Sequence, residues 1–287
     1  MTVRCHCGLT FCFSCKQDDH VPALCDHMRD WAKKEKDDSE TANWITANTK
    51  DCPKCKSPIE KNGGCNHMTC RPAAGGCGHE FCWLCFGDWR GHTSCGRYDE
   101  SKAQGASAAR ESLQRYMHYW TRFSAHRESE KLEEKLRAAA LRRQEAAVLR
   151  LSDATAGGGG GGAKPATGKE AYTAQDWDFV QHATDTLIRC RRVLKHTYVL
   201  AFYMKGGPEK NLFEFAQGEL EHAVEELSHM LEQSDERIDR VAVTNRYTAA
   251  VKMLRRIEER DSEMDLYILG EMAGTSGGGG GGGGGGR

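Results

Sequence analysis

The chain has 287 residues and a mass of 31.9 kDa, with 40 basic against 41 acidic side chains and a mean hydropathy of -0.66. A chain this close to neutral lacks the strongly basic face that nucleic-acid binding requires. No stretch approaches the ~20 apolar residues of a membrane span, and the first ten residues hold no apolar core of the signal-peptide type. The composition therefore argues against nucleic-acid and membrane partners.

Cysteine is concentrated at one end of the sequence. The chain holds 14 cysteines, and all but Cys190 lie in the first 95 residues, where they come as C-x2-C pairs with histidines between them. Zinc takes four such ligands in a tetrahedron, and a C-x2-C turn supplies two of them from one short loop. Without a secretory signal, this pattern predicts structural zinc rather than disulfides, and an intracellular reducing compartment such as the cytoplasm or nucleus.

The first 27 residues contain one complete set of ligands, which predicts a closed structural zinc site. Two further cysteines, Cys5 and Cys7, are half of another site. We expect the pair that would complete it to have stood upstream, so that the chain is a fragment or a truncated product. The polar stretch at 28–50 is expected to form helices that link this segment to the next. The complete set consists of Cys12, Cys15, His20 and Cys25.

A second cluster of ligands lies between residues 51 and 98. Two zinc ions would use eight of its eleven candidate ligands, so at least one cysteine is left free beside two metals. The spacing alone does not decide whether Cys65 or Cys70 completes the first of these sites. The eleven candidates are Cys52, Cys55, Cys65, His67, Cys70, Cys77, His79, Cys82, Cys85, His92 and Cys95.

One cysteine of this cluster has the sequence context of a nucleophile. Cys65 follows Gly63 and Gly64, where a tight backbone turn would expose its side chain. His67 is close enough in an extended segment to take a proton from the thiol or from an attacking amine, with Glu60 as an auxiliary carboxylate. On spacing alone, plain zinc ligation by Cys65 remains the alternative.

The sequence beyond residue 101 has the pattern of an all-α domain. Apolar residues recur at helical spacing in four segments, and a helix stop stands at Gly206-Gly207-Pro208. We expect the first helix to run to about Leu151, a flexible glycine-rich loop at 154–167, and a disordered glycine-rich tail at 271–287. The predicted fold is a set of small zinc-stabilised domains followed by a helical bundle at 102–270. The apolar positions of the first helix are Leu113, Tyr116, Met117, Trp120, Phe123, Leu132 and Leu136.

Three parts of the chain resemble one known family, the RING-between-RING (RBR) E3 ubiquitin ligases. Residues 1–27, with the pattern C-x-C-x4-C-x2-C-x4-H-x4-C, resemble the C-terminal part of an in-between-RING (IBR) domain. Residues 51–98, with CPKC, IEKNGGCNHMTC and EFCWLC, resemble the second RING-like domain, called RING2 or Rcat. The stretches SETANWITANTK, CRRVL and YVLAFY are similar to the Ariadne subfamily. The resemblance implies a partial IBR and a RING2/Rcat-like domain followed by an all-α Ariadne helical bundle.

The resemblance also implies roles for residues of the second cluster. Cys65 would accept ubiquitin as a thioester from a charged E2 conjugating enzyme and pass it to a lysine of a protein substrate. His67 would deprotonate the attacking amine, and Glu60 would be an auxiliary, which implies a ubiquitin transferase. The two zinc ions would be held by Cys52, Cys55, Cys70 and Cys77 and by Cys82, Cys85, His92 and Cys95.

Membership of the subfamily would imply a form of regulation as well. In these ligases the Ariadne bundle folds back over the Rcat domain and shields the nucleophile until a partner, typically a neddylated cullin-RING ligase, releases it. In this chain such contacts would fall near Leu132 and Glu133. The alternative for that charged stretch is an ordinary exposed helix surface.

The chain departs from the family pattern upstream. The first RING domain, which recruits the conjugating enzyme, and the first half of the IBR domain are absent from this sequence, so we expect N-terminal truncation. The alternative to an enzyme is a zinc-folded scaffold or remnant that binds ubiquitin or a cullin complex without catalysis.

The ligand sets predict a zinc content. Because Cys5 and Cys7 cannot complete a site within this chain, we expect three zinc ions per chain, measured by elemental analysis after dialysis against metal-free buffer. A variant with both Cys5→Ser and Cys7→Ser should keep all three ions, whereas Cys12→Ser should keep two. A content of four ions in the unsubstituted chain would contradict this prediction.

Overall fold

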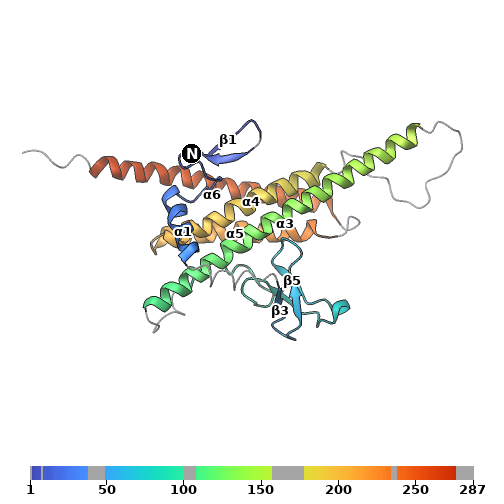
Figure 1. Ribbon diagram of the computed structural model, residues 1–287, viewed down its shortest axis with the longest axis horizontal. Coiled ribbons are helices and arrows are strands. Elements are labelled where there is room, and N and C mark those ends of the chain that lie inside the picture. Colours follow the sequence, from blue (N-terminus) through green and yellow to red (C-terminus); the bar gives the residue numbers. More distant parts are fainter. Residues whose placement is uncertain are drawn as a thin grey trace, which may run out of the picture.

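The structure, a computed structural model, describes residues 2–7, 9–37, 49–99, 108–156, 178–233 and 238–275. Short strands lie in the first third of the chain and long helices in the remainder (Figure 1). The strands are β1 (Thr2–Arg4), β2 (Thr10–Cys12), β3 (Thr49–Asp51), β4 (Pro58–Glu60), β5 (His67–Thr69) and β6 (Glu80–Cys82). The helices are α1 (Cys25–Asp37), the 3-10 turn η1 (Pro72–Ala74), α3 (Ala108–Ala156), α4 (Asp178–Tyr203), α5 (Pro208–Leu231) and α6 (Arg240–Thr275).

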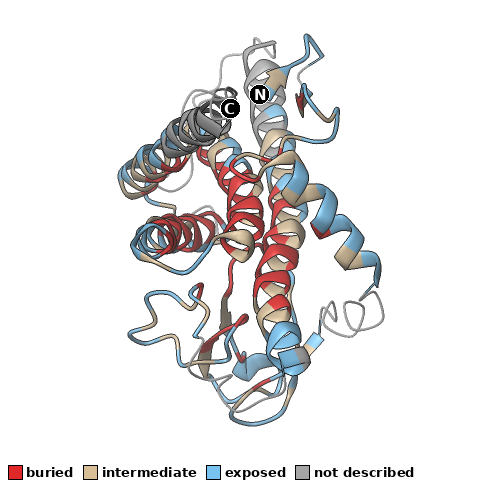
Figure 2. Cartoon of the chain, turned by 90° about the vertical axis from the view of Figure 1, so that its left-hand side faces the viewer, coloured by how far each residue is buried: buried red, intermediate tan, exposed pale blue. Residues whose placement is uncertain are grey.

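The long helices α3 to α6 form a bundle, and their inner faces are its core. Figure 2 shows buried residues along the sides of these helices that face one another, while their outer sides are exposed. The buried stripe arises because apolar residues recur every three or four positions. On α5 its apolar members include Phe213, Leu220, Val224, Leu227 and Leu231.

The predicted break between the second and third helices of the bundle is confirmed. Helix α4 ends at Tyr203, and α5 begins with Pro208 in its first turn, where a missing N–H costs nothing. Gly207 precedes it with φ of 152°, a backbone conformation that favours glycine. The chain therefore reverses direction here between two packed helices.

Two helix ends lie later than expected from the sequence. Helix α3 continues to Ala156 rather than ending near Leu151, because the glycine run, which disfavours helix, starts only at Gly157. Helix α6 continues to Thr275, past the expected start of the tail at 271, because the unbroken glycine run begins at Gly277.

The core face of α3 differs from the predicted pattern at two positions. Leu113, expected in the core, is 42% exposed, whereas Tyr119, outside the predicted pattern, is fully buried. The Tyr119 ring lies against Phe202 of α4, with centroids 5.8 Å apart. A periodic pattern indicates which face of a helix is covered, but it does not show where the neighbouring helices end.

The N-terminal zinc segment contributes directly to the bundle core. Helix α1 begins at Cys25 and places Trp31, which is 1% exposed, among three aromatic rings of the bundle. Its ring centroid lies 5.3 Å from that of Tyr116 and 5.5 Å from those of Phe123 and Phe202. Residues 1–37 are therefore joined to the helices by a packed aromatic contact and not only by the chain.

The second cysteine-rich segment, residues 49–99, is called here the Cys65 module. It is built on two antiparallel hairpins, β3–β4 and β5–β6, and lies against α3 and α5 (Figure 1). In the second hairpin His67 pairs with Cys82 and Thr69 with Glu80. This register brings residues from both halves of the IEKNGGCNHMTC…EFCWLC pattern to one hairpin.

Some predicted features lie outside the described residues. Of the helical linker expected at 28–50, α1 covers the beginning, and residues 38–48, with Trp44 and Ile45, are not described. The expectation is wrong at its end, where Thr49 and Lys50 pair with β4 as part of strand β3. The same holds for 157–177 and 276–287, which contain most of the glycine-rich loop and the tail. Among the helical residues that are described, none forms a segment long and apolar enough to cross a bilayer.

The aromatic contact of α1 predicts a large effect on stability. Replacing Trp31 by Ala removes a fully buried ring, so we expect a loss of about 3–5 kcal/mol in the free energy of unfolding, measured by denaturant titration. The control is Phe13→Ala in the same segment, since Phe13 is 64% exposed and its removal should change the stability by less than about 0.5 kcal/mol. Equal losses in the two variants would contradict the packing described.

Candidate functional site

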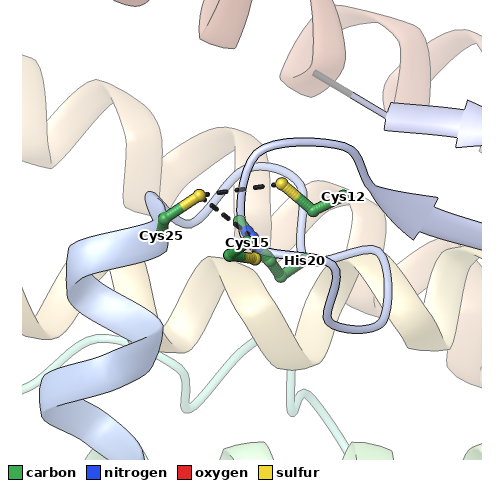
Figure 3. A group of neighbouring side chains, drawn as sticks. All are labelled: Cys12, Cys15, His20 and Cys25. Atoms are coloured by element: carbon green, nitrogen blue, oxygen red, sulfur yellow. Dashed lines mark hydrogen bonds between the residues drawn. The ribbon is translucent and has the colours of Figure 1, made fainter.

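Within the part of the chain that the structure describes, three groups of four cysteine and histidine residues have their ligand atoms within 4.8 Å of one another. The first is shown in Figure 3, where the side chains converge from the β2 turn and the start of α1. Its closest sulfur–nitrogen pair is Cys15 Sγ and His20 Nε2, at 3.3 Å. His20 uses its other ring nitrogen on the Ala23 carbonyl at 2.6 Å, a contact that fixes the tautomer of a metal ligand. Its members are Cys12, Cys15, His20 and Cys25.

The other two groups both lie in the Cys65 module. Their close pairs include Cys55 Sγ and Cys70 Sγ at 3.6 Å, and Cys85 Sγ and His92 Nε2 at 3.4 Å. Four thiol or imidazole ligands at such distances fit a tetrahedral zinc ion. The groups are Cys52, Cys55, Cys70 and Cys77, and Cys82, Cys85, His92 and Cys95.

These groups decide whether Cys65 or Cys70 lies among the metal ligands, which the spacing left open. Cys70 lies in a metal-ligand group, whereas Cys65 lies in none of the three. Cys5 and Cys7 are exposed and also belong to none of them. Among the cysteines of the second cluster, Cys65 is therefore the one left over.

The structure contradicts the expectation that two glycines expose the Cys65 side chain. Cys65 is only 2% exposed, because α5 and the residue that ends it cover the turn. Its thiol donates to the main-chain carbonyl of Glu225 at 3.4 Å, and its backbone N–H donates to Glu232 Oε1 at 3.0 Å. Burial and the two glutamates raise the pKa of Cys65 well above its ordinary value.

His67 contacts this thiol through its backbone, while the predicted role of its imidazole stays a prediction. Its backbone N–H donates to Cys65 Sγ at 3.4 Å, and its ring stacks on Trp89 with centroids 4.4 Å apart. The Glu80 carboxylate is 3.7 Å from His67 Nε2, and the ring of His229 on α5 lies 5.1 Å away. Burial and the proximity of His229 lower the pKa of His67.

The predicted auxiliary, Glu60, is an exposed residue of β4. It lines a groove of about 380 Å³ together with Cys65, His67 and residues at the end of α5. The carboxylate within ion-pair distance of His67 is that of Glu80. The groove runs between the two hairpins of the module and the end of α5, so it leads to the covered thiol.

The Gly64 carbonyl is the point where the bundle holds the turn before Cys65. It accepts hydrogen bonds from Ser129 Oγ of α3 at 2.7 Å, from Arg191 Nη2 of α4 at 3.0 Å, and from Lys61 Nζ at 3.2 Å. Arg191 is fully buried and also donates to Glu225 Oε1 at 2.6 Å. Donors from two helices thus converge on one main-chain oxygen.

Glu225 connects this arginine to the residue after the thiol. Its carboxylate accepts bonds from the backbone N–H of Asn66 and, at 2.7 Å, from Asn66 Nδ2. Burial alone would raise the pKa of Glu225, but the guanidinium of Arg191 holds it at about 2. A buried charged pair therefore bridges the module and the bundle.

Glu133 of α3 and Glu232 after α5 complete the contact. Ser228 donates to Glu133 Oε1 at 2.7 Å and to Glu232 Oε1 at 3.3 Å. Burial raises the pKa of Glu133 to about 7 despite the nearby arginine. A Cβ added to Gly64 would lie 2.0 Å from Glu133 Oε1, and one on Gly63 would lie 2.4 Å from Glu232 Oε1. The two glycines are needed for this close approach, and neither has a positive φ.

Sequence reasoning found Glu133 but missed the other charged residues of the contact. The expectation at Leu132 and Glu133 is right for Glu133, which is fully buried, while Leu132 is only half-buried. A signal was present on α5, where four large apolar core residues are each followed by a polar one. The pairs are Leu220-Glu221, Val224-Glu225, Leu227-Ser228 and Leu231-Glu232.

Comparison with known proteins agrees with this geometry. A family model described as IBR domain matches residues 47–101, which include the whole Cys65 module, and a model described as Ariadne domain matches residues 166–259. The matched description, IBR domain, differs from the RING2/Rcat-like domain expected at 51–98, so that assignment and the IBR assignment of residues 1–27 both remain predictions.

Curated relatives are similar along most of the chain. The chain is 41% identical over 243 residues to E3 ubiquitin-protein ligase dbl4 of Schizosaccharomyces pombe, covering 81% of this chain and 43% of the relative. It is 41% identical over 239 residues to E3 ubiquitin-protein ligase ariadne-1 of Drosophila melanogaster, covering 80% and 43%. The chain spans less than half the length of these relatives. It belongs to the Ariadne family of RING-between-RING E3 ubiquitin ligases.

Proposed function

We propose that this chain is a ubiquitin transferase, which takes ubiquitin from a charged E2 conjugating enzyme onto Cys65 as a thioester and passes it to a lysine of a protein substrate. The observation that carries the proposal is a cysteine that lies outside all three metal-ligand groups, accepts a bond from the backbone N–H of His67 and lines the same groove as that histidine. The names of the relatives, E3 ubiquitin-protein ligases, support the same class of activity.

The chemistry takes two acyl transfers. In the first, the Cys65 thiolate attacks the carbonyl carbon of the ubiquitin C-terminus, and the sulfur of the conjugating enzyme leaves with the electron pair of the broken C–S bond. In the second, a lysine amine attacks the new thioester, its proton passes to His67, and the Cys65 thiolate leaves. The lowered pKa of His67 keeps its imidazole neutral near pH 7, as a proton acceptor requires.

The orientation of His67 has support from two neighbours. The Trp89 ring stacks on the imidazole, and Glu80 lies near Nε2. An imidazolium formed during the second step would be stabilised by this carboxylate. Glu80 therefore joins Glu60 as a candidate for the auxiliary role.

The metals in this proposal are structural. Each group supplies four protein ligands, which complete the tetrahedral shell of Zn²⁺, and bound zinc supplies folding energy to such small domains. The hairpin β5–β6 carries His67 and is flanked by Cys70 of one group and Cys82 of the other. The two sites thus fix the base relative to the thiol.

The buried thiol supports a closed, autoinhibited state. A thiol with a raised pKa is a poor nucleophile, and α5 covers Cys65 where the conjugating enzyme and ubiquitin must reach it. Activity then requires a partner that moves the bundle. The family resemblance makes a neddylated cullin-RING ligase the candidate, in a reducing compartment such as the cytoplasm or nucleus.

The burial of Cys65 also favours a second candidate function. The chain would then be a zinc-folded scaffold that binds ubiquitin or a cullin complex without forming a covalent bond. The two functions differ in whether Cys65 reacts with the ubiquitin C-terminus.

Ubiquitin with an electrophilic C-terminus tests this difference. We expect slow attachment of one ubiquitin per chain to Cys65, through the transiently open fraction of the closed chain, as shown by peptide mapping, and no adduct in Cys65→Ala. A Cys7→Ser variant, which loses an exposed thiol, should be labelled like the unsubstituted chain. Labelling of Cys5 or Cys7 with Cys65 unmodified, in zinc-loaded protein, would favour the scaffold.

The bridge through Glu225 predicts an activating substitution. Glu225→Ala removes the nearer carboxylate partner of Arg191, at 2.6 Å, leaves it Glu133 at 3.5 Å, and takes an acceptor from Asn66. Breaking a buried ion pair costs about 3–5 kcal/mol in comparable sites, and so favours opening of the contact. We expect Cys65 to be labelled at least ~10-fold faster, because a cost of 1.4 kcal/mol already corresponds to that factor.

The matched control for this variant is the next residue. Glu226 is half-buried and pairs with Arg246 of α6, away from the Cys65 turn. Glu226→Ala should leave the labelling rate of Cys65 unchanged. If both variants label at the rate of the unsubstituted chain while remaining folded, the bundle does not control access to Cys65.

A further inference from the structure

Lys61 belongs to the Cys65 module and places its side-chain ammonium at the turn before Cys65. Its Nζ donates to the Gly64 carbonyl at 3.2 Å and to Asn66 Oδ1 at 2.9 Å, which are the residues on either side of Cys65. Its third bond goes to Ser129 Oγ of α3, at 3.0 Å. An ammonium has three donors, so all three are used.

The remaining charges at this turn come mainly from the bundle. Helix α4 contributes Arg191, and α3 contributes Glu133. Helix α5 contributes Glu225, and the residue after its end is Glu232. These groups are on the side that must move if Cys65 is to be reached. His67, on the module, faces the thiol through its backbone N–H.

Opening would therefore change which charges surround Cys65. In the closed arrangement, burial, Glu225 and Glu232 oppose ionisation of the thiol, and Arg191, which would also leave with the bundle, partly offsets them. Burial also lowers the pKa of Lys61 to about 8. When the helices leave, the glutamates leave with them, but two of the three Lys61 bonds lie within the module and stay. Hydration then favours the charged ammonium, since a buried cation is disfavoured only while water is excluded.

We infer that Lys61 is a positioning residue for the Cys65 thiolate: it ties Gly64 to Asn66 and so shapes the turn, and its positive charge favours the ionised sulfur once the bundle has moved. This inference rests on the proposed function, because it concerns the first nucleophilic step. It adds a requirement, namely that the residue four positions before the nucleophile be a cation with several donors. An apolar residue would fill the same space but would neither bond the two acceptors nor attract the thiolate.

The test is the pH dependence of Cys65 alkylation by iodoacetamide in the full chain with Glu225→Ala. Iodoacetamide reacts with the thiolate, so the midpoint of the rate profile reports the apparent pKa of Cys65. We expect Lys61→Met to raise this midpoint by about one pH unit and to slow alkylation at pH 7 about tenfold, the size of a single charge interaction near the surface of a protein. Lys61→Arg should keep the midpoint close to that of Lys61.

Further variants separate charge from packing. Lys61→Gln keeps a donor for the turn but has no charge, so it should shift the midpoint as Lys61→Met does. It also serves if Lys61→Met loses zinc or fails to fold. If Glu225→Ala does not speed alkylation, the Lys61 variants are compared in the chain that keeps Glu225. Alkylation is then followed over hours, because Cys65 reacts only while the contact is transiently open. Equal midpoints for Lys61, Lys61→Gln and Lys61→Met would overturn the inference.

The reagent also separates this inference from the proposed function. Iodoacetamide needs no ubiquitin and no partner, so the midpoint can shift as predicted even if Cys65 forms no bond with ubiquitin. Conversely, Cys65 can react with ubiquitin even if the midpoint of the alkylation profile does not change when Lys61 is replaced. The two results are therefore independent.

Discussion

The closed arrangement of this chain depends on the buried ion pair between Arg191 and Glu225. A buried arginine is tolerated only when its charge is paired and its donors are used, and here the partners are a carboxylate of α5 and a main-chain carbonyl of the Cys65 module. Glu225 in turn accepts two bonds from Asn66, directly after the thiol. Both members of the pair belong to the bundle, and each also bonds the module, Arg191 at Gly64 and Glu225 at Asn66. The position of the module on the bundle, the burial of Cys65 and its raised pKa all follow from this pair.

The sequence predicts the parts of the molecule that depend on local spacing. Cys12, Cys15, His20 and Cys25 are brought together as expected, because short intervals along the chain restrict where such ligands can meet. The helix break at Gly207 and Pro208 is likewise local. What spacing left open, the choice between Cys65 and Cys70, needed either the family resemblance or the structure, because both residues lie within reach of the same cluster.

The features that the sequence does not predict depend on contacts between distant segments. The burial of Cys65 is caused by residues about 160 positions later, and the role of Gly64 is set by Glu133. Lys61 and Arg191 look like ordinary surface cations until their acceptors are known. The alternation of apolar and polar residues on α5 indicates a second contact face, but it does not show what covers that face.

The zinc sites and the bundle have different physical roles in this account. In the proposal, zinc bound by the two groups would fix His67 and Cys65 relative to each other within the module, whereas the charged contact would determine whether the thiol is covered. Because the second is a set of polar bonds between packed surfaces, it can be exchanged for water or for a partner without unfolding the first. This separation allows the chain to hold Cys65 and His67 in a folded module while the bundle keeps Cys65 inaccessible.

The central claim is that Cys65 is an acyl acceptor held closed by the bundle. Its most direct test is transthiolation from ubiquitin carried as a small-molecule thioester, in the Glu225→Ala chain loaded with zinc. The account predicts a ubiquitin adduct on Cys65 that is cleaved by excess thiol, decays when free lysine is added, and decays more slowly in His67→Ala. A thioester on another cysteine, or no adduct while Cys65 is freely alkylated, would contradict it.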